Sequence, residues 1–344
     1  MTKSIAIIVS NFYGGGAEKS MLTLHFKLIN QGIHSTLISI NKNQTFVNIS
    51  SNSMVEIGRE KDSGLLGFLK GFFEFYSFLL KYKPSVIVLN CDLPETYGAL
   101  YVLSQTKIRV VVVEHANPSW PTRRKLGYIV RKILIWRKAT FVSVSNHITP
   151  PFENHSYSEI VPNFISELGN LAEHDSNDEI KRLIYIGRLT SVYKNPQSLI
   201  QISKETGIPV VFFGTGEMET ELRALSQEEG VTAEFRGWVD DPWSEILAED
   251  LLIVPSTREG DGLVIVEAIV KRVPLLLKDV TDLRRFQLAD SNYCVSEEEF
   301  SDRIRKFRYS LRELKPTREV KNTLIQDRSD SRLLQAWISL LNRL

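Results

Sequence analysis

The chain has 344 residues, 43% of them hydrophobic, so it is long enough for two hydrophobic cores, and its formal net charge is +1. The two halves differ in charge, and nucleic acid is not the obvious partner of such a dipolar chain. The charge is unevenly divided, because residues 1–165 hold 18 Lys and Arg against 10 Asp and Glu, a net +8, whereas residues 166–344 hold 24 against 31, a net −7. The two cysteines, Cys91 and Cys294, offer neither a disulfide framework nor metal-ligand spacing, which indicates a reducing cytoplasm.

Strand and helix patterns alternate through the first half of the chain. The first apolar run is too short for a signal peptide and predicts a strand. A helix follows over residues 16–30 and ends at Gly32. Largely apolar strands separated by helices are typical of a parallel sheet that is covered on both faces. The strands are predicted at residues 4–9, 34–40, 85–89, 108–113 and 140–144.

Residues 64–80 form the most apolar long segment. Lys70 and Glu74 in its middle argue against a membrane-spanning helix and favour a buried or interfacial one.

A basic segment covers residues 122–138, and no acidic residue occurs between Glu114 and Glu153. Two interpretations stay open, a solvated helix with an apolar core face and a patch for an anionic membrane surface. The apolar positions are Leu126, Ile129, Val130, Ile133 and Leu134, and the cations are Arg123, Arg124, Lys125, Arg131, Lys132, Arg137 and Lys138.

The second half repeats the alternation of strand and helix after a polar segment. We predict an N-terminal domain, a linker, a second domain of the same type, and a closing amphipathic helix with apolar residues at helical spacing. Their bounds are 1–164, 165–180, 181–329 and 330–344; the strands of the second domain are predicted at 183–186, 210–213, 233–236, 251–254 and 274–277. Two doubly wound domains would place a ligand cleft at the carboxyl ends of their sheets.

The segment 256–269, S-T-R-E-G-D-G-L-V-I-V-E-A-I, follows a buried strand and leads into a helix. Gly260 and Gly262 let the backbone approach a ligand, and a helix start offers free N–H groups to an anion. Glu259 and Glu267 are carboxylates that can each accept hydroxyl hydrogen bonds. This combination suits a nucleotide sugar.

Arg188 and Lys194 lie six positions apart just after a predicted strand. A loop there can place both cations on a diphosphate, although solvated surface cations would show the same pattern. No Asp-x-Asp pair is present and Asp240 and Asp241 are adjacent, so we expect neither a metal nor another cofactor to be required.

The motif E-G-D-G-L-V-I-V-E-A resembles the E-x7-E motif of retaining glycosyltransferases of family 4, which have the GT-B fold. Further motifs occur in that family's order: G-G-A-E at 15–18, V-P-N at 161–163, Y-I-G-R-L-T-S-V-Y-K-N at 185–195, F-F-G-T-G-E at 212–217 and F-R-G-W-V at 235–239. The resemblance therefore spans most of the chain. It implies two Rossmann-like domains and a C-terminal helix that crosses back to the first.

The resemblance also implies roles for individual residues. Glu267 would bind the ribose hydroxyls, Glu259 with the backbone of residues 260–263 would hold the transferred sugar, and Asp261 departs from the aromatic or small apolar residue that the family often has. The predicted catalytic residues are His115, Arg188, Lys194 and Glu259. The predicted donor-binding residues are Gly15, Gly16, Gly187, Arg188, Lys194, Gly214, Trp238, Val239, Glu259, Gly260, Asp261, Gly262, Leu263 and Glu267.

Gly14, Gly15 and Gly16 also invite a dinucleotide-binding interpretation. The spacing excludes it, because Lys19 stands where the third glycine of G-x-G-x-x-G is needed. A glycine loop that reaches a phosphate remains, with Glu18 on the first helical turn. His115 follows a strand and matches the family's cleft histidine, and its loop neighbours Glu114, Asn117 and Trp120 are candidates for acceptor contact.

We therefore expect a retaining enzyme that moves a sugar from a nucleoside-diphosphate sugar to a hydroxyl acceptor. Family habit suggests a glycan or lipid-linked glycan acceptor in bacterial surface polysaccharide or lipopolysaccharide assembly, and a cytoplasmic location at the inner face of the cell membrane. Two alternatives remain, a non-hydrolysing nucleotide-sugar epimerase on the same fold and a catalytically silent sugar-binding relative.

Overall fold

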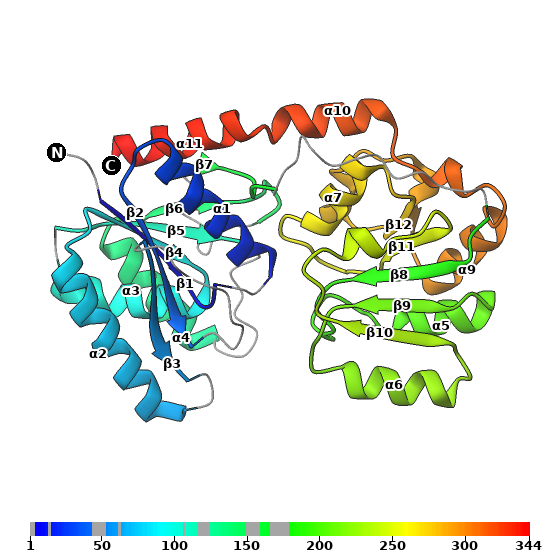
Figure 1. The fold of residues 1–344 in the computed structure, drawn as a ribbon, viewed down its shortest axis with the longest axis horizontal. Coiled ribbons are helices and arrows are strands. Elements are labelled where there is room, and N and C mark those ends of the chain that lie inside the picture. The colour runs from blue at the N-terminus through cyan, green and yellow to red at the C-terminus, as the bar shows by residue number, and fades with distance from the viewer. Residues whose placement is uncertain are drawn as a thin grey trace. The chain divides into compact units, whose positions relative to one another are not determined.

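The computed structural model describes residues 4–12, 15–42, 53–60, 63–105, 107–115, 124–148, 159–165 and 179–344. The chain divides into two compact units (Figure 1). The first unit contains Met1–Ser166 together with Arg328–Leu344, and the second contains Glu167–Asp327. Each unit has its own parallel sheet and its own core, so the predicted pair of doubly wound α/β folds is confirmed. The predicted linker, 165–180, lies largely outside the described residues.

The first unit is built on a parallel sheet in the order β3-β2-β1-β4-β5-β6-β7. Every residue of β1, β2 and β4 is buried, which explains why these strands read as continuous apolar runs rather than alternating ones. The strands are β1 (Ile5–Val9), β2 (Ser35–Asn41), β3 (Met54–Arg59), β4 (Val86–Asn90), β5 (Arg109–Glu114), β6 (Thr140–Ser143) and β7 (Glu159–Ile160).

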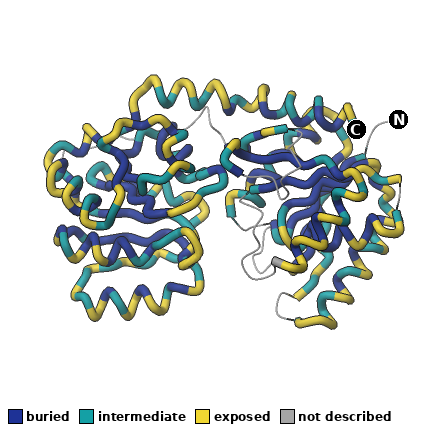
Figure 2. The backbone as a smooth tube through the Cα atoms, turned by 180° about the vertical axis from the view of Figure 1, so that it is seen from behind, coloured by how far each residue is buried: buried dark blue, intermediate teal, exposed yellow. Residues whose placement is uncertain are grey.

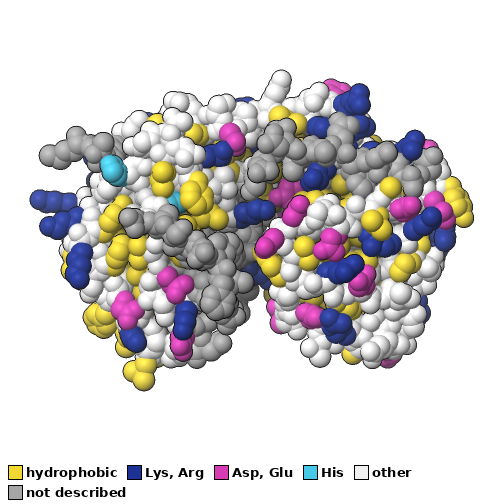
Figure 3. All heavy atoms as spheres, in the orientation of Figure 1, with side chains coloured by type: hydrophobic (Ala, Val, Ile, Leu, Met, Phe, Trp, Pro, Cys, Tyr) yellow, Lys and Arg dark blue, Asp and Glu magenta, His cyan; other side chains and the backbone are white. Residues whose placement is uncertain are grey.

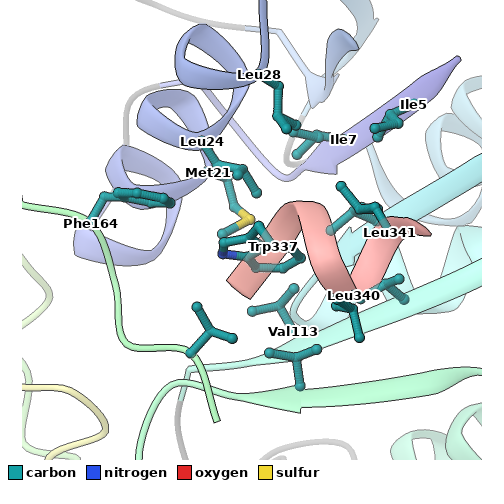
Figure 4. Close-up of a cluster of buried hydrophobic side chains, with 14 of the residues drawn as sticks. Ile5, Ile7, Met21, Leu24, Leu28, Val113, Phe164, Trp337, Leu340 and Leu341 are labelled. Atoms are coloured by element: carbon teal, nitrogen blue, oxygen red, sulfur yellow. The ribbon is translucent and has the colours of Figure 1, made fainter. Parts of the chain in front are cut away.

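Two helices, α1 (Gly16–Asn30) and α11 (Asp330–Arg343), pack on one face of this sheet. The indole of Trp337 on α11 is fully buried there, beside Met21, Leu24 and Phe164 (Figure 4). Removing a buried indole costs about 3–5 kcal/mol. The first unit therefore depends on a helix that follows the second unit in the chain.

Three helices cover the other face of the first sheet. They are α2 (Gly64–Tyr82), α3 (Asp92–Ser104) and α4 (Arg124–Trp136). Phe75 and Leu79 of α2, Tyr97 of α3 and Leu134 of α4 are buried against the strands. No helix in the described part of the chain is long and apolar enough to cross a membrane.

The second unit carries a parallel sheet in the order β10-β9-β8-β11-β12-β13. Helices α5, α6 and α9 contribute to one core with side chains of β8, β9 and β11, and the strands run dark in the burial view (Figure 2). The strands are β8 (Arg182–Ile186), β9 (Val210–Phe213), β10 (Ala233–Gly237), β11 (Asp250–Val254), β12 (Leu275–Lys278) and β13 (Tyr293–Cys294). The α-helices are α5 (Ser198–Thr206), α6 (Glu219–Glu228), α7 (Leu263–Lys271), α8 (Thr281–Arg284), α9 (Glu297–Lys306) and α10 (Arg318–Asp327), with 3-10 turns η2 (Pro242–Glu245), η3 (Asp290–Asn292) and η4 (Leu311–Leu314).

Candidate functional site

The carboxyl ends of β8, β9 and β10 meet at one edge of the second sheet. The Gly187 N–H donates to the Phe213 carbonyl at 2.9 Å, and the Gly214 N–H donates to the Gly237 carbonyl at 2.7 Å. A Cβ on Gly214 would lie 1.9 Å from the Gly187 carbonyl oxygen, and the Gly214 φ of +139° is left-handed, so only glycine fits. This close packing brings the predicted donor residues Gly187, Gly214, Trp238 and Val239 to the same edge.

The loop after β8 holds both predicted cations. The buried Tyr185 hydroxyl donates to the Arg188 carbonyl at 2.9 Å, while the Arg188 side chain itself is exposed. Burial, and secondarily the Glu259 charge, raises the pKa of Tyr185, so this hydroxyl stays a donor. Glu217 has a lowered pKa, first because Thr190 donates to it and more weakly because of the Arg188 charge.

Lys194 sits between two residues with left-handed backbone, Tyr193 at φ +67° and Asn195 at φ +50°. The Asn195 amide nitrogen donates to Glu297 at 3.3 Å, and the Thr257 N–H donates to the Tyr193 carbonyl at 2.8 Å. The loop is thus tied both to α9 and to the segment after β11. These ties hold a strained stretch in place and fix the base of the Lys194 side chain.

The loop between β11 and α7 faces Lys194. The Lys194 ammonium and the Glu259 carboxylate form an ion pair of 2.6 Å, with the Glu259 side chain 11% exposed. Gly262 caps α7 with φ +63°, where a side chain would be strained. The structure therefore brings together a cation and a carboxylate that are 65 positions apart in the sequence.

Two residues that sequence reasoning missed support this loop from the region of α8. The Arg285 guanidinium donates to the Gly260 carbonyl at 2.8 Å, and the Glu259 N–H lies 3.4 Å from the Asp282 carboxylate. Asp261 between the two glycines is buried. No sequence motif marks Asp282 or Arg285, because their importance lies only in which backbone atoms they reach.

Glu267 is also held by a residue that sequence reasoning missed. The Trp243 indole N–H, on η2, donates to the Glu267 carboxylate at 2.8 Å. Trp238 differs, because the residue is 59% exposed and its indole N–H donates to Asp240 at 3.1 Å. Glu267 is thus oriented before any ligand arrives, while Trp238 offers an aromatic surface to solvent.

The predicted residues of the first unit lie at the carboxyl edge of its sheet. The Gly15 N–H donates to the Glu18 carboxylate at 2.9 Å at the start of α1, which begins at Gly16. His115 follows β5 directly and is partly buried. Gly14, Asn117 and Trp120 lie outside the described residues.

Glu114 and Arg131 correct two predictions. Instead of facing an acceptor, the buried Glu114 carboxylate accepts two hydrogen bonds from Arg131, at 3.0 and 3.3 Å. Arg131 was expected among the surface cations of residues 122–138, but its side chain is 4% exposed and also lies 3.4 Å from Glu95. Burial, then the Glu114 charge, raises the pKa of Glu95 well above its usual range. Burial raises the pKa of Glu114 as well, but the Arg131 charge lowers it. Because the Arg131 hydrogen bonds at 3.0 and 3.3 Å both go to Glu114, we assign the ion pair to Arg131 and Glu114, with Glu95 as the neutral acid.

The apolar residues of α4 divide between the core and the surface. Val130 and Leu134 are buried, but Leu126 and Ile129 are 41% and 54% exposed. The described residues hold no group of three His, Cys, Asp or Glu side chains that could bind a metal ion.

This fold and this site define a protein with the GT-B glycosyltransferase fold. Residues 170–310, which lie within the second unit, match the family model of glycosyl transferases group 1. A search of curated protein sequences gives no match.

Solved glycosyltransferase structures share the architecture of the whole chain. The lipopolysaccharide outer core galactosyltransferase WaaB in its apo form aligns with a TM-score of 0.69 and 17% identity, covering 99% of this chain and 100% of that one. HepE from Anabaena in complex with UDP and glucose aligns with a TM-score of 0.78 and 14% identity over 99% and 100% of the two chains. WaaG, a glycosyltransferase involved in lipopolysaccharide biosynthesis, aligns with a TM-score of 0.64 and 14% identity over 96% of each chain.

Proposed function

We propose that the protein is a retaining glycosyltransferase that moves a sugar from a nucleoside-diphosphate sugar to a hydroxyl acceptor. The observation that carries the proposal is the Lys194–Glu259 ion pair at 2.6 Å. It joins a cation suited to a diphosphate with a carboxylate suited to sugar hydroxyls, in front of the helix that bears Glu267. A nucleoside-diphosphate sugar carries both kinds of group.

The donor would be bound by groups from three loops of the second unit. Lys194 and Arg188 neutralise the diphosphate, the free N–H groups at the start of α7 add to this, and Glu267 accepts from the ribose hydroxyls. Glu259 and the backbone of residues 260–263 hold the sugar. Because the cations stabilise charge on the departing diphosphate, they lower the barrier to breaking the sugar–phosphate bond. We expect no metal to be needed, so activity should persist in a chelator.

Retention of configuration follows from the role we give to Glu259. A carboxylate that binds hydroxyls remote from the anomeric carbon is no nucleophile, and the leaving diphosphate oxygen is then the nearest base for the acceptor proton. The acceptor attacks from the face that the diphosphate leaves. Proton coupling at the anomeric carbon of the product tests this step, and an inverted linkage would contradict it.

The acceptor is proposed to be a glycan or lipid-linked glycan that contacts the first unit near His115, in the assembly of bacterial lipopolysaccharide or another surface polysaccharide. The lipopolysaccharide enzymes among the structural matches support this choice. We place the protein in the cytoplasm at the inner face of the membrane. The exposed face of α4 supports this location, because Lys125 and Lys132 lie there beside Tyr128, with the Lys132 ammonium 4.5 Å from the Tyr128 ring centre.

A thermal-shift screen of nucleoside diphosphates and their sugars tests the proposal most directly. A ligand present at 100 times its dissociation constant stabilises the folded protein by about 2.7 kcal/mol. At least one nucleoside diphosphate should stabilise the wild type, and the effect should be much smaller for Lys194→Ala. If none does, the donor assignment is wrong. Conversion of the free donor to another nucleotide sugar without an acceptor would instead favour the epimerase.

A further inference from the structure

Helix α2 carries a row of exposed apolar side chains on its outer side. Leu66 is 83% exposed and Phe73 is 63% exposed, and Leu65, Leu69 and Leu80 are exposed as well. Residues 66, 69, 73 and 80 recur at helical spacing and so share one side of the helix, opposite the buried residues 71, 75 and 79. We call this row together with the adjacent Leu65, that is residues 65, 66, 69, 73 and 80, the α2 outer face, and Figure 3 shows hydrophobic side chains at the surface along α2.

Helix α2 is packed firmly against α3, although its outer face is exposed. The Tyr97 hydroxyl donates to the Phe68 carbonyl at 2.7 Å, and the Tyr76 hydroxyl lies 2.9 Å from the Ser104 hydroxyl, so α3 holds α2 at two points. Ring contacts of Phe72 and Phe75 with Tyr97, at 5.6 and 5.5 Å between centroids, add to the hold. The α2 outer face is therefore a fixed surface, and leaving it in water is unfavourable.

The charges around this face indicate what covers it. Lys70 and Glu74 form an i,i+4 ion pair on the side of α2 next to this face. Lys81 lies on the same side of the helix and has no acidic residue to balance it there. Across the described part of residues 53–148, the exposed acidic side chains are Glu56, Glu60, Glu74 and Asp92. The exposed cations of the same part are Lys70, Lys81, Lys83, Lys107, Arg109, Lys125, Lys132 and Lys138.

We propose that the α2 outer face inserts into the headgroup region of an anionic lipid bilayer, as an interfacial helix. An apolar row beside Lys81, in a region where exposed cations outnumber exposed acids, matches the boundary between acyl chains and anionic headgroups. Helix α4, on the same face of the first sheet, carries Trp136, which is 69% exposed, and aromatic rings of this kind favour the same boundary. The inference adds an apolar anchor to the charge contact that we propose for α4. It rests on the proposed membrane location for the choice of a lipid bilayer as the partner.

The experiment measures sedimentation of the full chain with vesicles of phosphatidylcholine alone or mixed with phosphatidylglycerol, at low and high salt. The wild type should bind the anionic vesicles and keep part of this binding at high salt, because apolar insertion is not screened. Leu66→Gln with Phe73→Gln should lower the partition coefficient about tenfold or more. Both side chains are exposed, so thermal unfolding should not change.

A matched pair on the second unit, Val295→Gln with Tyr309→Gln, removes similarly exposed apolar groups and should bind as the wild type does. Wild-type binding by the α2 variant would overturn the inference. A wild-type dimer in light scattering that this variant dissolves would also overturn it, because the occupant would be a second copy. If Lys125→Gln with Lys132→Gln abolishes binding and the α2 variant does not, only the α2 inference fails. Donor binding in the thermal-shift screen tests glycosyl transfer independently of both.

Discussion

Replacing Arg131 by Met should destabilise the first unit far more than the same change at its exposed neighbour Lys132. Arg131 is 4% exposed and lies within 3.4 Å of two buried carboxylates, so its loss leaves Glu114 buried without the cation that balances it. Removing one partner of a buried ion pair costs about 3–5 kcal/mol. A domain of 150–250 residues loses about 2–4 °C per kcal/mol, so the midpoint should fall by about 6–20 °C.

Thermal unfolding followed by circular dichroism measures the effect, with Lys132→Met as the control that removes a cation from the same helix. The control should stay within about 0.5 kcal/mol of the wild type, as exposed substitutions usually do. Equal midpoints for the two variants would refute the reasoning and return Arg131 to the surface patch that the sequence suggested.

The same cluster predicts a pH dependence. The raised pKa of Glu95 means that the folded unit holds a proton that the unfolded chain releases. The contribution of Glu95 to the free energy of unfolding is fully present below the ordinary Glu pKa of about 4.3. It is lost as the pH rises through the raised pKa of Glu95 in the folded state. Glu95→Gln holds no such proton, so it should be less sensitive to pH across this window. If the free energy of unfolding changes with pH in the same way for the variant and the wild type, Glu95 is not protonated in the folded protein.

The remaining predictions concern the second unit. Lys194→Ala and Arg188→Ala should each raise the dissociation constant for UDP, or for the diphosphate found in the screen, by about tenfold to a hundredfold without lowering the unfolding midpoint, as calorimetry would show. Glu267→Gln should mainly raise the donor KM and Glu259→Gln should mainly lower kcat; the same change in both constants for both variants would reject this division of roles. Trp243→Phe keeps an aromatic ring but loses the indole N–H that donates to Glu267, so nucleotide affinity should fall about threefold to tenfold. Trp136→Phe, in the first unit, is the control for this variant. If the two variants bind the nucleotide with equal affinity, Trp243 does not position Glu267.

The sequence predicts the parallel sheets well because buried parallel strands such as β1 and β4 are almost uninterrupted apolar runs. It misses β7 and β13, which are two residues long and have no periodicity to detect. It also misses β3, whose residues are partly or fully exposed at the edge of the sheet. Pattern length and burial, rather than residue type, separate these cases.

The site divides in the same way. The positions of Lys194, Glu259 and Glu267 can be predicted because each lies in a local motif beside a strand end or a helix start. Trp243 and Arg131 could not be, since their partners lie 24 and 17 positions away and neither partner stands in a helical or strand repeat with them. Arg131 is the harder case, because six other cations in the same segment favour a surface interpretation.

The placement of α11 has a consequence for the order in which the protein is made. The indole of Trp337 fills the core between α1 and the first sheet, yet Glu167–Asp327 must leave the ribosome before that indole exists. At about 5–20 residues per second, this delay is on the order of 10–30 s. During that time the nascent first unit exposes the apolar side of α1 and of β1, β4 and β5, while the second unit has all of its own core residues. The second unit can therefore fold first during translation, and chaperone binding should concentrate on the earlier half of the nascent chain.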